Sequence, residues 1–327
     1  MRFLVTRTIS FFDDDPWGPN VDVENEAGYV NSRVDRLPLR MRNLAQRWYE
    51  FQFALRLLRR SRRYDGFAVG RYSIWFPILH RLFRLHGPVV MTDTEWKRAS
   101  GGRVNRAAAT SSAVVCSNTR AEIERYSRQY GIPAAKFELV PLAFQRRDIH
   151  EPATDEGYVF AGGAQGRDWQ TLVDAVDGLP YGVQVYTNNK LPRVPVNTEV
   201  HYVGRTEFYR RMAAASCVVV PLLAEPLRIT GTTTWTAAMA MGKVVIVTEP
   251  DGAPDYMEHG VSGFYVNHGD AKALRECIVK VMEDAALRKR VGKAARERAW
   301  REFSPEVFRR RVLGLLKAAA GKNGGLG

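Results

Sequence analysis

Short apolar runs rich in β-branched residues recur along the chain, and segments with a helical spacing of apolar positions lie between them. The clearest example spans residues 217–247. Its two apolar runs, Cys217–Val220 and Val244–Val247, are typical of parallel strands that are buried on both faces. The Ala- and Met-rich segment between these runs ends at Gly242 and predicts a helix. The stretch therefore predicts one βαβ unit of an α/β domain.

The same alternation predicts strands and helices over most of the chain. We expect strands at 3–6, 65–70, 88–92, 113–119, 136–142, 158–162, 183–187 and 199–204. We expect helices at 39–63, 78–85, 120–130, 172–176 and 207–215, and four helical segments between 271 and 320. The stretch 10–35 is polar and contains Gly and Pro, so it predicts a long loop.

The length of 327 residues predicts two domains rather than one. Cys116, Cys217 and Cys277 are widely spaced within apolar runs, so we expect buried free thiols and no metal cluster. The chain has no run of about 18 apolar residues, and its first residues lack the pattern of a secretory signal. These features predict a cytoplasmic protein.

The net charge of +13 indicates an anionic partner. Five arginines lie at the end of the predicted helix 39–63, which also carries aromatic residues: Arg56, Arg59, Arg60, Arg62, Arg63, Trp48, Tyr49, Phe51 and Phe53. In one interpretation the helix faces the core, and the cations sit where the helix dipole favours them. In the other, its basic and aromatic face lies on an anionic bilayer, at the inner side of the membrane. Nucleic acid is not expected, because the sequence lacks the basic-aromatic motifs of nucleic-acid-binding domains.

A Gly- and Thr-rich turn precedes the helix of the βαβ unit. The backbone N–H groups of Thr232, Thr233 and Thr234, which follow Gly231, predict a phosphate or diphosphate site at the start of this helix. Arg228 lies just before the turn and could add a positive charge. The alternative is that these threonines only cap the helix.

Several motifs in order resemble those of GT-B glycosyltransferases, most closely the retaining family 4 type. They are Ala237-Ala-Met-Ala-Met-Gly242-Lys-Val-Val, Gly252-Ala-Pro-Asp255, His259-Gly-Val-Ser-Gly263 and, in the first half, Gly131-Ile-Pro. The resemblance implies an α/β fold of two Rossmann-like domains that face each other across a cleft. Residues 1–150 would form the acceptor domain and residues 151–303 the nucleotide-sugar donor domain, with a C-terminal helix at about 304–320 crossing back to the first.

The resemblance also implies which residues act. Arg167 falls at the position of the family's diphosphate-binding Lys, whereas Gly162 falls where its partner Arg stands, and Arg228 could replace that missing charge. On the acceptor side, Asp93 follows a strand and either serves catalysis or caps the next helix. The implied donor-binding residues are Gly162, Gly163, Gly204, Arg205, Glu225, Gly231, Thr232, Thr233 and Thr234, with the base near Gly204 and Arg205.

One departure concerns the family's ribose-binding Glu, whose position is occupied by Ala237. Either Thr234 or Thr236 holds the ribose, or nucleotide affinity is weak, or the donor is unusual. Asp13, Asp14 and Asp15 could form a metal site, but three adjacent acids in a loop are ordinarily only solvated.

The resemblance therefore implies a metal-independent glycosyltransferase of the hexosyltransferase type that transfers with retention. We expect a UDP-sugar donor, no tightly bound cofactor, and a small-molecule, glycan or lipid-linked acceptor. The alternative is a catalytically silent GT-B-like binding module, which Ala237 and the missing basic residue favour.

Overall fold

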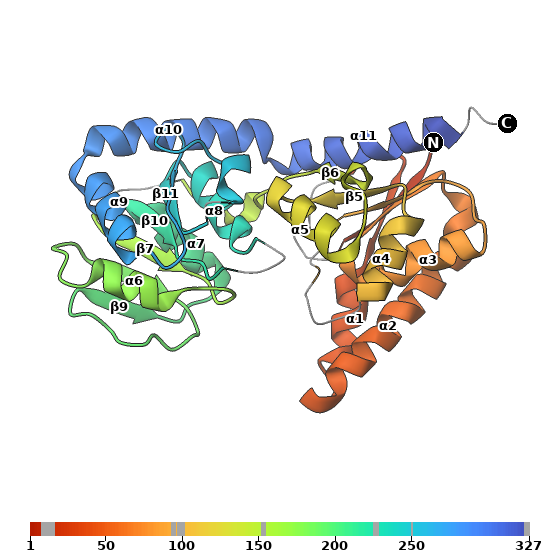
Figure 1. Cartoon of the computed structure of the whole chain (residues 1–327), viewed down its shortest axis with the longest axis horizontal. Coiled ribbons are helices and arrows are strands. Elements are labelled where there is room, and N and C mark those ends of the chain that lie inside the picture. Colours follow the sequence, from red (N-terminus) through yellow and green to blue (C-terminus); the bar gives the residue numbers. More distant parts are fainter. Residues whose placement is uncertain are drawn as a thin grey trace. The chain divides into compact units, whose positions relative to one another are not determined.

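The protein is described by a computed structural model, which covers residues 1–7, 17–92, 96, 102–151, 155–224, 229–249 and 251–323. It divides into two compact units, one of residues 1–140 with 308–327 and one of residues 141–307. Each unit contains a six-stranded sheet with helices packed against it (Figure 1). All strand pairs in both sheets are parallel, so the predicted α/β class is confirmed.

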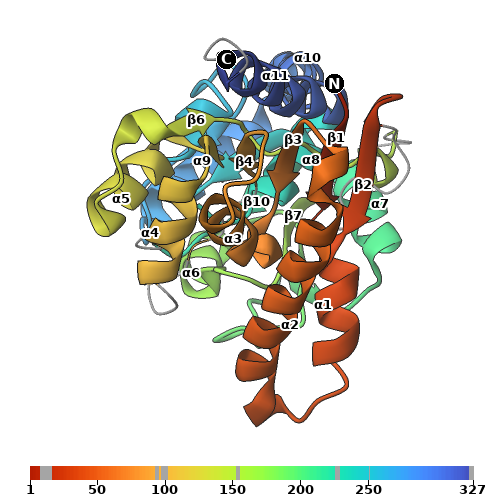
Figure 2. The same ribbon diagram turned by 90° about the vertical axis from the view of Figure 1, so that its right-hand side faces the viewer.

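The sheet of the first unit has the strand order β2-β1-β3-β4-β5-β6. Its strands are β1 (Phe3–Arg7), β2 (Val21–Asn25), β3 (Gly66–Val69), β4 (Val89–Met91), β5 (Val114–Ser117) and β6 (Phe137–Leu139). Its helices are α1 (Glu26–Val34), α2 (Leu39–Arg60), α3 (Trp75–Leu82), α4 (Gly102–Ser111) and α5 (Arg120–Tyr130). The helices α1 and α2 lie side by side as a hairpin, and α2 also packs on α3 (Figure 2).

The predicted long loop at 10–35 is wrong over its second half, because β2 and α1 lie there. β2 is held by its pairing with β1, in which Val21 aligns with Phe3 and Val23 with Val5. The side chain of Asn25 then caps α1 by accepting a hydrogen bond from the N–H of Gly28, at 2.8 Å.

The sheet of the second unit has the order β12-β11-β10-β7-β8-β9. Its strands are β7 (Val159–Gly162), β8 (Val183–Tyr186), β9 (Thr198–His201), β10 (Cys217–Val220), β11 (Val244–Val247) and β12 (Phe264–Tyr265). The helices α6 (Trp169–Val176), α7 (Arg205–Ala214) and α8 (Thr232–Ala240) connect them. The βαβ unit predicted over 217–247 is thus confirmed as β10, α8 and β11.

Both faces of this sheet are buried, as its apolar strands predict. In β10, Val218 and Val220 face a core shared with α7 and α8, whereas Cys217 and Val219 face a core shared with α6. Burial raises the pKa of the Cys217 thiol to about 12, so it behaves as a small apolar side chain. Cys116 is buried in the same way, but Cys277 is only half-buried, which corrects the expectation of three buried thiols.

Three C-terminal helices follow rather than four: α9 (Ala271–Glu283), α10 (Ala285–Glu302) and α11 (Pro305–Asn323). α11 begins among residues of the second unit and continues through residues of the first. α10 packs closely on α8, because a Cβ atom at Gly292 would lie 2.2 Å from the carbonyl oxygen of Gly242. Among the residues with described coordinates, no helix combines the length and apolar character needed to cross a bilayer.

The outer strands of both sheets either carry acidic residues or are very short. β2 carries Asp22 and Glu24, β6 has three residues and carries the exposed Glu138, and β9 carries the exposed Glu199. β12 has only two residues.

Candidate functional site

Two loops meet at the C-terminal edge of the second sheet, which is the side formed by the carboxyl ends of its strands. They follow the paired strands β7 and β10. The N–H of Asp168 donates to the carbonyl of Pro221 at 3.1 Å, and the N–H of Leu223 donates to the carbonyl of Gly166 at 3.0 Å. Ligands of open α/β sheets bind outside the carboxyl ends of the strands. This edge is therefore where a ligand of the second unit is expected.

Arg167 lies at the centre of this edge and is only 8% exposed. Its Nε donates to the carbonyl oxygen of Gly162 at 2.8 Å, its Nη1 to that of Gln165 at 2.8 Å, and its Nη2 to Thr234 Oγ1 at 3.2 Å. These acceptors are all neutral, and no carboxylate of the described residues lies within ion-pair distance of the guanidinium.

Burial lowers the pKa of Arg167 to about 10, so the group keeps its charge near neutral pH. The three bonds leave one N–H on each terminal nitrogen. A buried cation with no neighbouring anion is costly, and an anionic ligand would offset this cost.

Two glycines bring backbone against the guanidinium. A Cβ atom at Gly163 would lie 2.3 Å from Nη2 of Arg167, and one at Gly231 would lie 3.3 Å from Nη1. Both glycines also have positive φ, +113° and +78°. The structure thus brings together three of the residues singled out in the sequence, Arg167, Gly163 and Gly231, although they come from two separate loops.

Gly231 is followed directly by the first turn of α8, which begins at Thr232. The carbonyl oxygen of Gly231 accepts from the N–H groups of Thr234 and Trp235 at 2.9 and 3.1 Å. The described residues supply no acceptor for the N–H groups of Thr232 and Thr233, and no described side chain caps the helix. Free N–H groups at a helix start are an anion site, so this geometry favours the phosphate interpretation over simple capping.

Thr230 carries a second unsatisfied group at this edge. Its Oγ1 is buried and has no hydrogen-bond partner among the described residues. A Cβ atom at Gly166, whose φ is +63°, would lie 2.7 Å from this oxygen. The sequence patterns gave no signal for Thr230, because a single Thr beside a Thr-rich turn is not distinctive.

The absence of a second basic residue at Gly162 has a packing reason. A Cβ atom there would lie 2.5 Å from the ring of Phe208, which α7 places against the end of β7. No larger side chain fits at this position without moving the ring.

Gly204 and Arg205, the residues expected near the base, lie at the start of α7. The space around Gly204 is open, with no atom within 4 Å of a Cβ atom built there. The guanidinium of Arg205 is already paired in a bidentate manner with the buried carboxylate of Asp148, at 2.8 and 2.5 Å. The charge of Arg205 therefore stabilises the position of α7, and its backbone groups rather than its guanidinium are available to a ligand.

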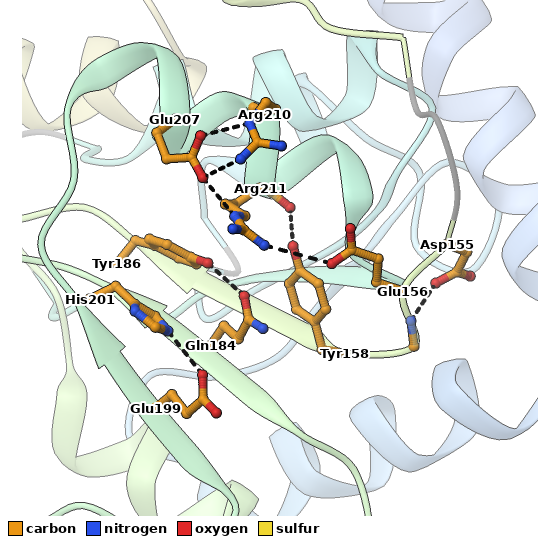
Figure 3. A network of polar contacts seen from close by, with 11 residues as sticks. Asp155, Glu156, Tyr158, Gln184, Tyr186, Glu199, His201, Glu207, Arg210 and Arg211 are labelled. Atoms are coloured by element: carbon orange, nitrogen blue, oxygen red, sulfur yellow. Dashed lines mark hydrogen bonds and ion pairs between the residues drawn. The ribbon is translucent and has the colours of Figure 1, made fainter.

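A polar network fastens α7 to the sheet beside this point (Figure 3). Glu207 accepts from Arg210 and Arg211, which lowers the pKa of its carboxyl group to about 2. The hydroxyl of Tyr158 donates to the carbonyl of Arg211 at 2.5 Å. His201 stacks on Tyr186, and its Nε2 lies 3.2 Å from Oε2 of Glu199 within β9, so its contacts are those of a structural strand residue.

The two threonines considered for ribose binding have different environments. Thr236 is fully buried and its hydroxyl donates to the carbonyl of Thr232 at 2.8 Å, which rules it out as a ribose contact. Thr234 accepts from Arg167, and Ala237 is buried in the core. Asp13, Asp14, Asp15, Asp93, Glu225 and Arg228 lie outside the described residues.

His268 is a residue that the sequence patterns missed. Its Nδ1 lies 3.0 Å from the carbonyl oxygen of Leu222, and its Nε2 lies 3.4 Å from Oε2 of the buried Glu249. Glu249 also accepts from the N–H groups of Asp251 and Gly252 at 3.1 and 3.3 Å. His268 thus ties the loop after β10 to the loop after β11, and Leu222 in turn packs next to Gly231.

The arrangement of the elements is that of a GT-B fold. Over 97% of this chain and 100% of the other, the structure resembles that of HepE from Anabaena in complex with UDP, with a TM-score of 0.71 and 15% sequence identity. This likeness concerns the fold.

Residues 181–284 match the family model described as Glycosyl transferases group 1. The chain is 38% identical over 71 residues to the capsular polysaccharide biosynthesis glycosyltransferase CapM of Staphylococcus aureus, covering 22% of this chain and 19% of that protein. It is 34% identical over 83 residues to the amylovoran biosynthesis glycosyltransferase AmsK of Erwinia amylovora, covering 25% and 20%. The matches thus span about a fifth of these relatives. The fold is thus that of the GT-B class, and residues 181–284 resemble the corresponding segment of group 1 glycosyltransferases.

Proposed function

We propose that the chain transfers a sugar from a nucleotide-sugar, with a UDP-sugar as the expected donor, to an acceptor bound by the first unit. The observation that carries this proposal is Arg167, a buried cation whose partners among the described residues are all neutral. It lies next to the N–H groups of Thr232 and Thr233, for which the same part of the chain supplies no acceptor. The spacing and charge of these groups suit a diphosphate. The HepE complex with UDP supports the choice of donor for a chain of this fold.

In this proposal the second unit stabilises the leaving diphosphate electrostatically. Arg167 and the helix start would bind the negative charge that develops when the bond between the sugar and the diphosphate breaks. We include Arg228 and Glu225 on the donor side, and Asp93 on the acceptor side. Transfer with retention, and a glycan, small-molecule or lipid-linked acceptor, belong to the same proposal. The free thiols fit a reducing compartment, so we propose a cytoplasmic location.

A panel of UDP-, GDP- and TDP-sugars in thermal unfolding tests the donor. We expect a UDP-sugar at about 100 times its Kd to add roughly 2.7 kcal/mol to the free energy of unfolding, which raises the Tm by several degrees. The other two donors should have much smaller effects. A chain that responds to none of them would instead be the catalytically silent binding module, which the buried Ala237 and the filled space at Gly162 favour.

We further propose that transfer needs no metal ion, because Arg167 and the helix start supply the positive charge that the diphosphate requires. Donor turnover should therefore continue at its normal rate in excess EDTA. Loss of turnover with EDTA, and its return with Mn²⁺ or Mg²⁺, would contradict this and direct attention to Asp13, Asp14 and Asp15.

A further inference from the structure

The α1–α2 hairpin exposes apolar side chains on one face of α2. Met41, Leu44 and Trp48 are 51%, 82% and 57% exposed. Residues at this spacing share one face of a helix. We call these three residues the hairpin patch.

The hairpin patch is not part of the core. A different face of α2 is buried and carries Phe53, Ala54 and Leu57, each at most 1% exposed. Trp48 stacks on Phe51, with ring centroids 6.3 Å apart, and Phe51 contacts Trp75 edge-on at 5.8 Å. The exposed face is thus backed by a continuous aromatic layer. Folding does not require a Leu and a Trp to be this exposed side by side, so the patch indicates an interaction surface.

The charge around the patch is positive. Residues 33–50 contain five arginines and two acidic residues, Asp35 and Glu50, which gives a net charge of +3. Asp35 and Glu50 are paired with Arg42 and Arg47. The exposed Arg36 has no carboxylate partner among the residues that the structure describes.

The arginines at the far end of α2 differ from one another. Arg56 and Arg60 pair with Glu24 of β2, so they serve the fold. Arg59 is exposed, and the described residues offer it no acidic partner. It follows Met41 by 18 residues, which is five helical turns, so both lie on the same face about 27 Å apart. One side of α2 thus presents apolar residues at one end and an unpaired cation at the other.

We propose that this face of α2 binds an anionic lipid surface. A helix lying in the membrane plane buries its apolar residues at the headgroup boundary and places its cations near the anionic headgroups. A Trp at that boundary has its preferred environment. The proposal does not depend on sugar transfer, since it concerns only where the chain is held.

Vesicle flotation tests this surface. The full chain should float with vesicles of phosphatidylcholine and phosphatidylglycerol at low salt, and much less with phosphatidylcholine alone. Recovery should decline as salt rises, because the Debye length falls from ~30 Å at 0.01 M to ~10 Å at 0.1 M. A double change of Leu44→Ser and Trp48→Ser should lower the partition coefficient at least about tenfold. The matched change Val196→Ser with Tyr202→Ser, at exposed apolar residues of the second unit, should leave it unchanged.

A second matched pair of variants tests the contribution of charge to this binding. Arg59→Gln should weaken binding to anionic vesicles roughly fivefold. Arg56→Gln should have a smaller effect, because this side chain is engaged by Glu24. Far-UV circular dichroism confirms that each variant is folded.

Three results would overturn the proposal: no lipid-dependent recovery, equal recovery with neutral vesicles, or unchanged binding of the Leu44/Trp48 variant. If size-exclusion chromatography instead shows a dimer that this variant abolishes, the patch binds a second copy of the chain.

Discussion

Replacing Arg167 with Met should weaken UDP binding by about 2–5 kcal/mol, roughly 30-fold to several thousand-fold in Kd, with only a small change in the stability of the unliganded protein. Binding falls because the diphosphate loses a desolvated, hydrogen-bonded cation. The stability should change little because the partners of the guanidinium among the described residues are all neutral. Isothermal titration calorimetry and urea unfolding measure the two effects.

Two opposing contributions keep the effect of this substitution on stability small. Burial lowers the pKa of Arg167 from its usual value to about 10, so the charged form is less favoured in the folded chain than in the unfolded chain. At neutral pH the folded protein therefore bears the cost of a buried charge, and Met removes it. Three hydrogen bonds are lost at the same time, so we expect a small net change of either sign rather than a gain of several kcal/mol.

Lys243→Met is the matched control. Lys243 is also a buried cation of the second unit, with its Nζ donating to the carbonyl of Ala215 at 2.8 Å. It precedes β11 and so lies at the opposite edge of the sheet from Arg167. Its loss should not change the Kd for UDP. Equal affinities of the Arg167→Met variant and the wild type would remove Arg167 from the donor site.

Gly292→Ala should destabilise the protein by about 2–3 kcal/mol, which lowers the Tm by roughly 5–10 °C. The added methyl group would lie 2.2 Å from the carbonyl oxygen of Gly242, and backbone cannot move aside as a flexible side chain can. α10 would therefore have to separate from α8, whose first turn forms the proposed anion site. Thermal unfolding of the wild type and of the Gly292→Ala variant measures the shift in Tm.

Gly314→Ala in α11 is the matched control, because Gly314 is exposed and no atom lies within 4 Å of a Cβ atom built there. At an open helical position Ala is favoured over Gly by up to about 1 kcal/mol, so this variant should be slightly more stable. If both variants behave alike, helix propensity decides the outcome and α8 and α10 do not pack as closely as described.

Elements of the fold could be predicted wherever the sequence pattern of a single segment is sufficient to specify them. The boundaries of β10 and β11 follow from their apolar runs, and those of α5 follow from its cap at Thr119 and the left-handed Gly131, whose φ is +61°. β2 has no such signal, because its two valines alternate with acidic residues and its stability comes from pairing with β1. The helix α4 was not predicted, because its Ala- and Arg-rich sequence lacks a clear apolar stripe.

The candidate site was predictable only in part for a related reason. Arg167, Gly163 and Gly231 stand in recognisable turns, so the sequence singles them out. The pairing of Arg205 with Asp148 joins residues 57 positions apart, and the contact of His268 with Leu222 spans 46. The neutral surroundings of Arg167 depend on side chains brought together by folding, and no sequence pattern reports them.

The acidic residues and short lengths of the outer strands have a consequence for how this chain behaves at high concentration. An exposed strand offers unpaired N–H and C=O groups to another molecule, and edge-to-edge pairing of this kind leads to aggregation. Acidic residues on β2, β6 and β9, and the two-residue length of β12, oppose such pairing at every outer strand described. The outer strands therefore disfavour self-association through backbone pairing, whereas the side chains of Met41, Leu44 and Trp48 are exposed. At high concentration, contact between copies of the chain should form through the helical hairpin before it forms through the sheets.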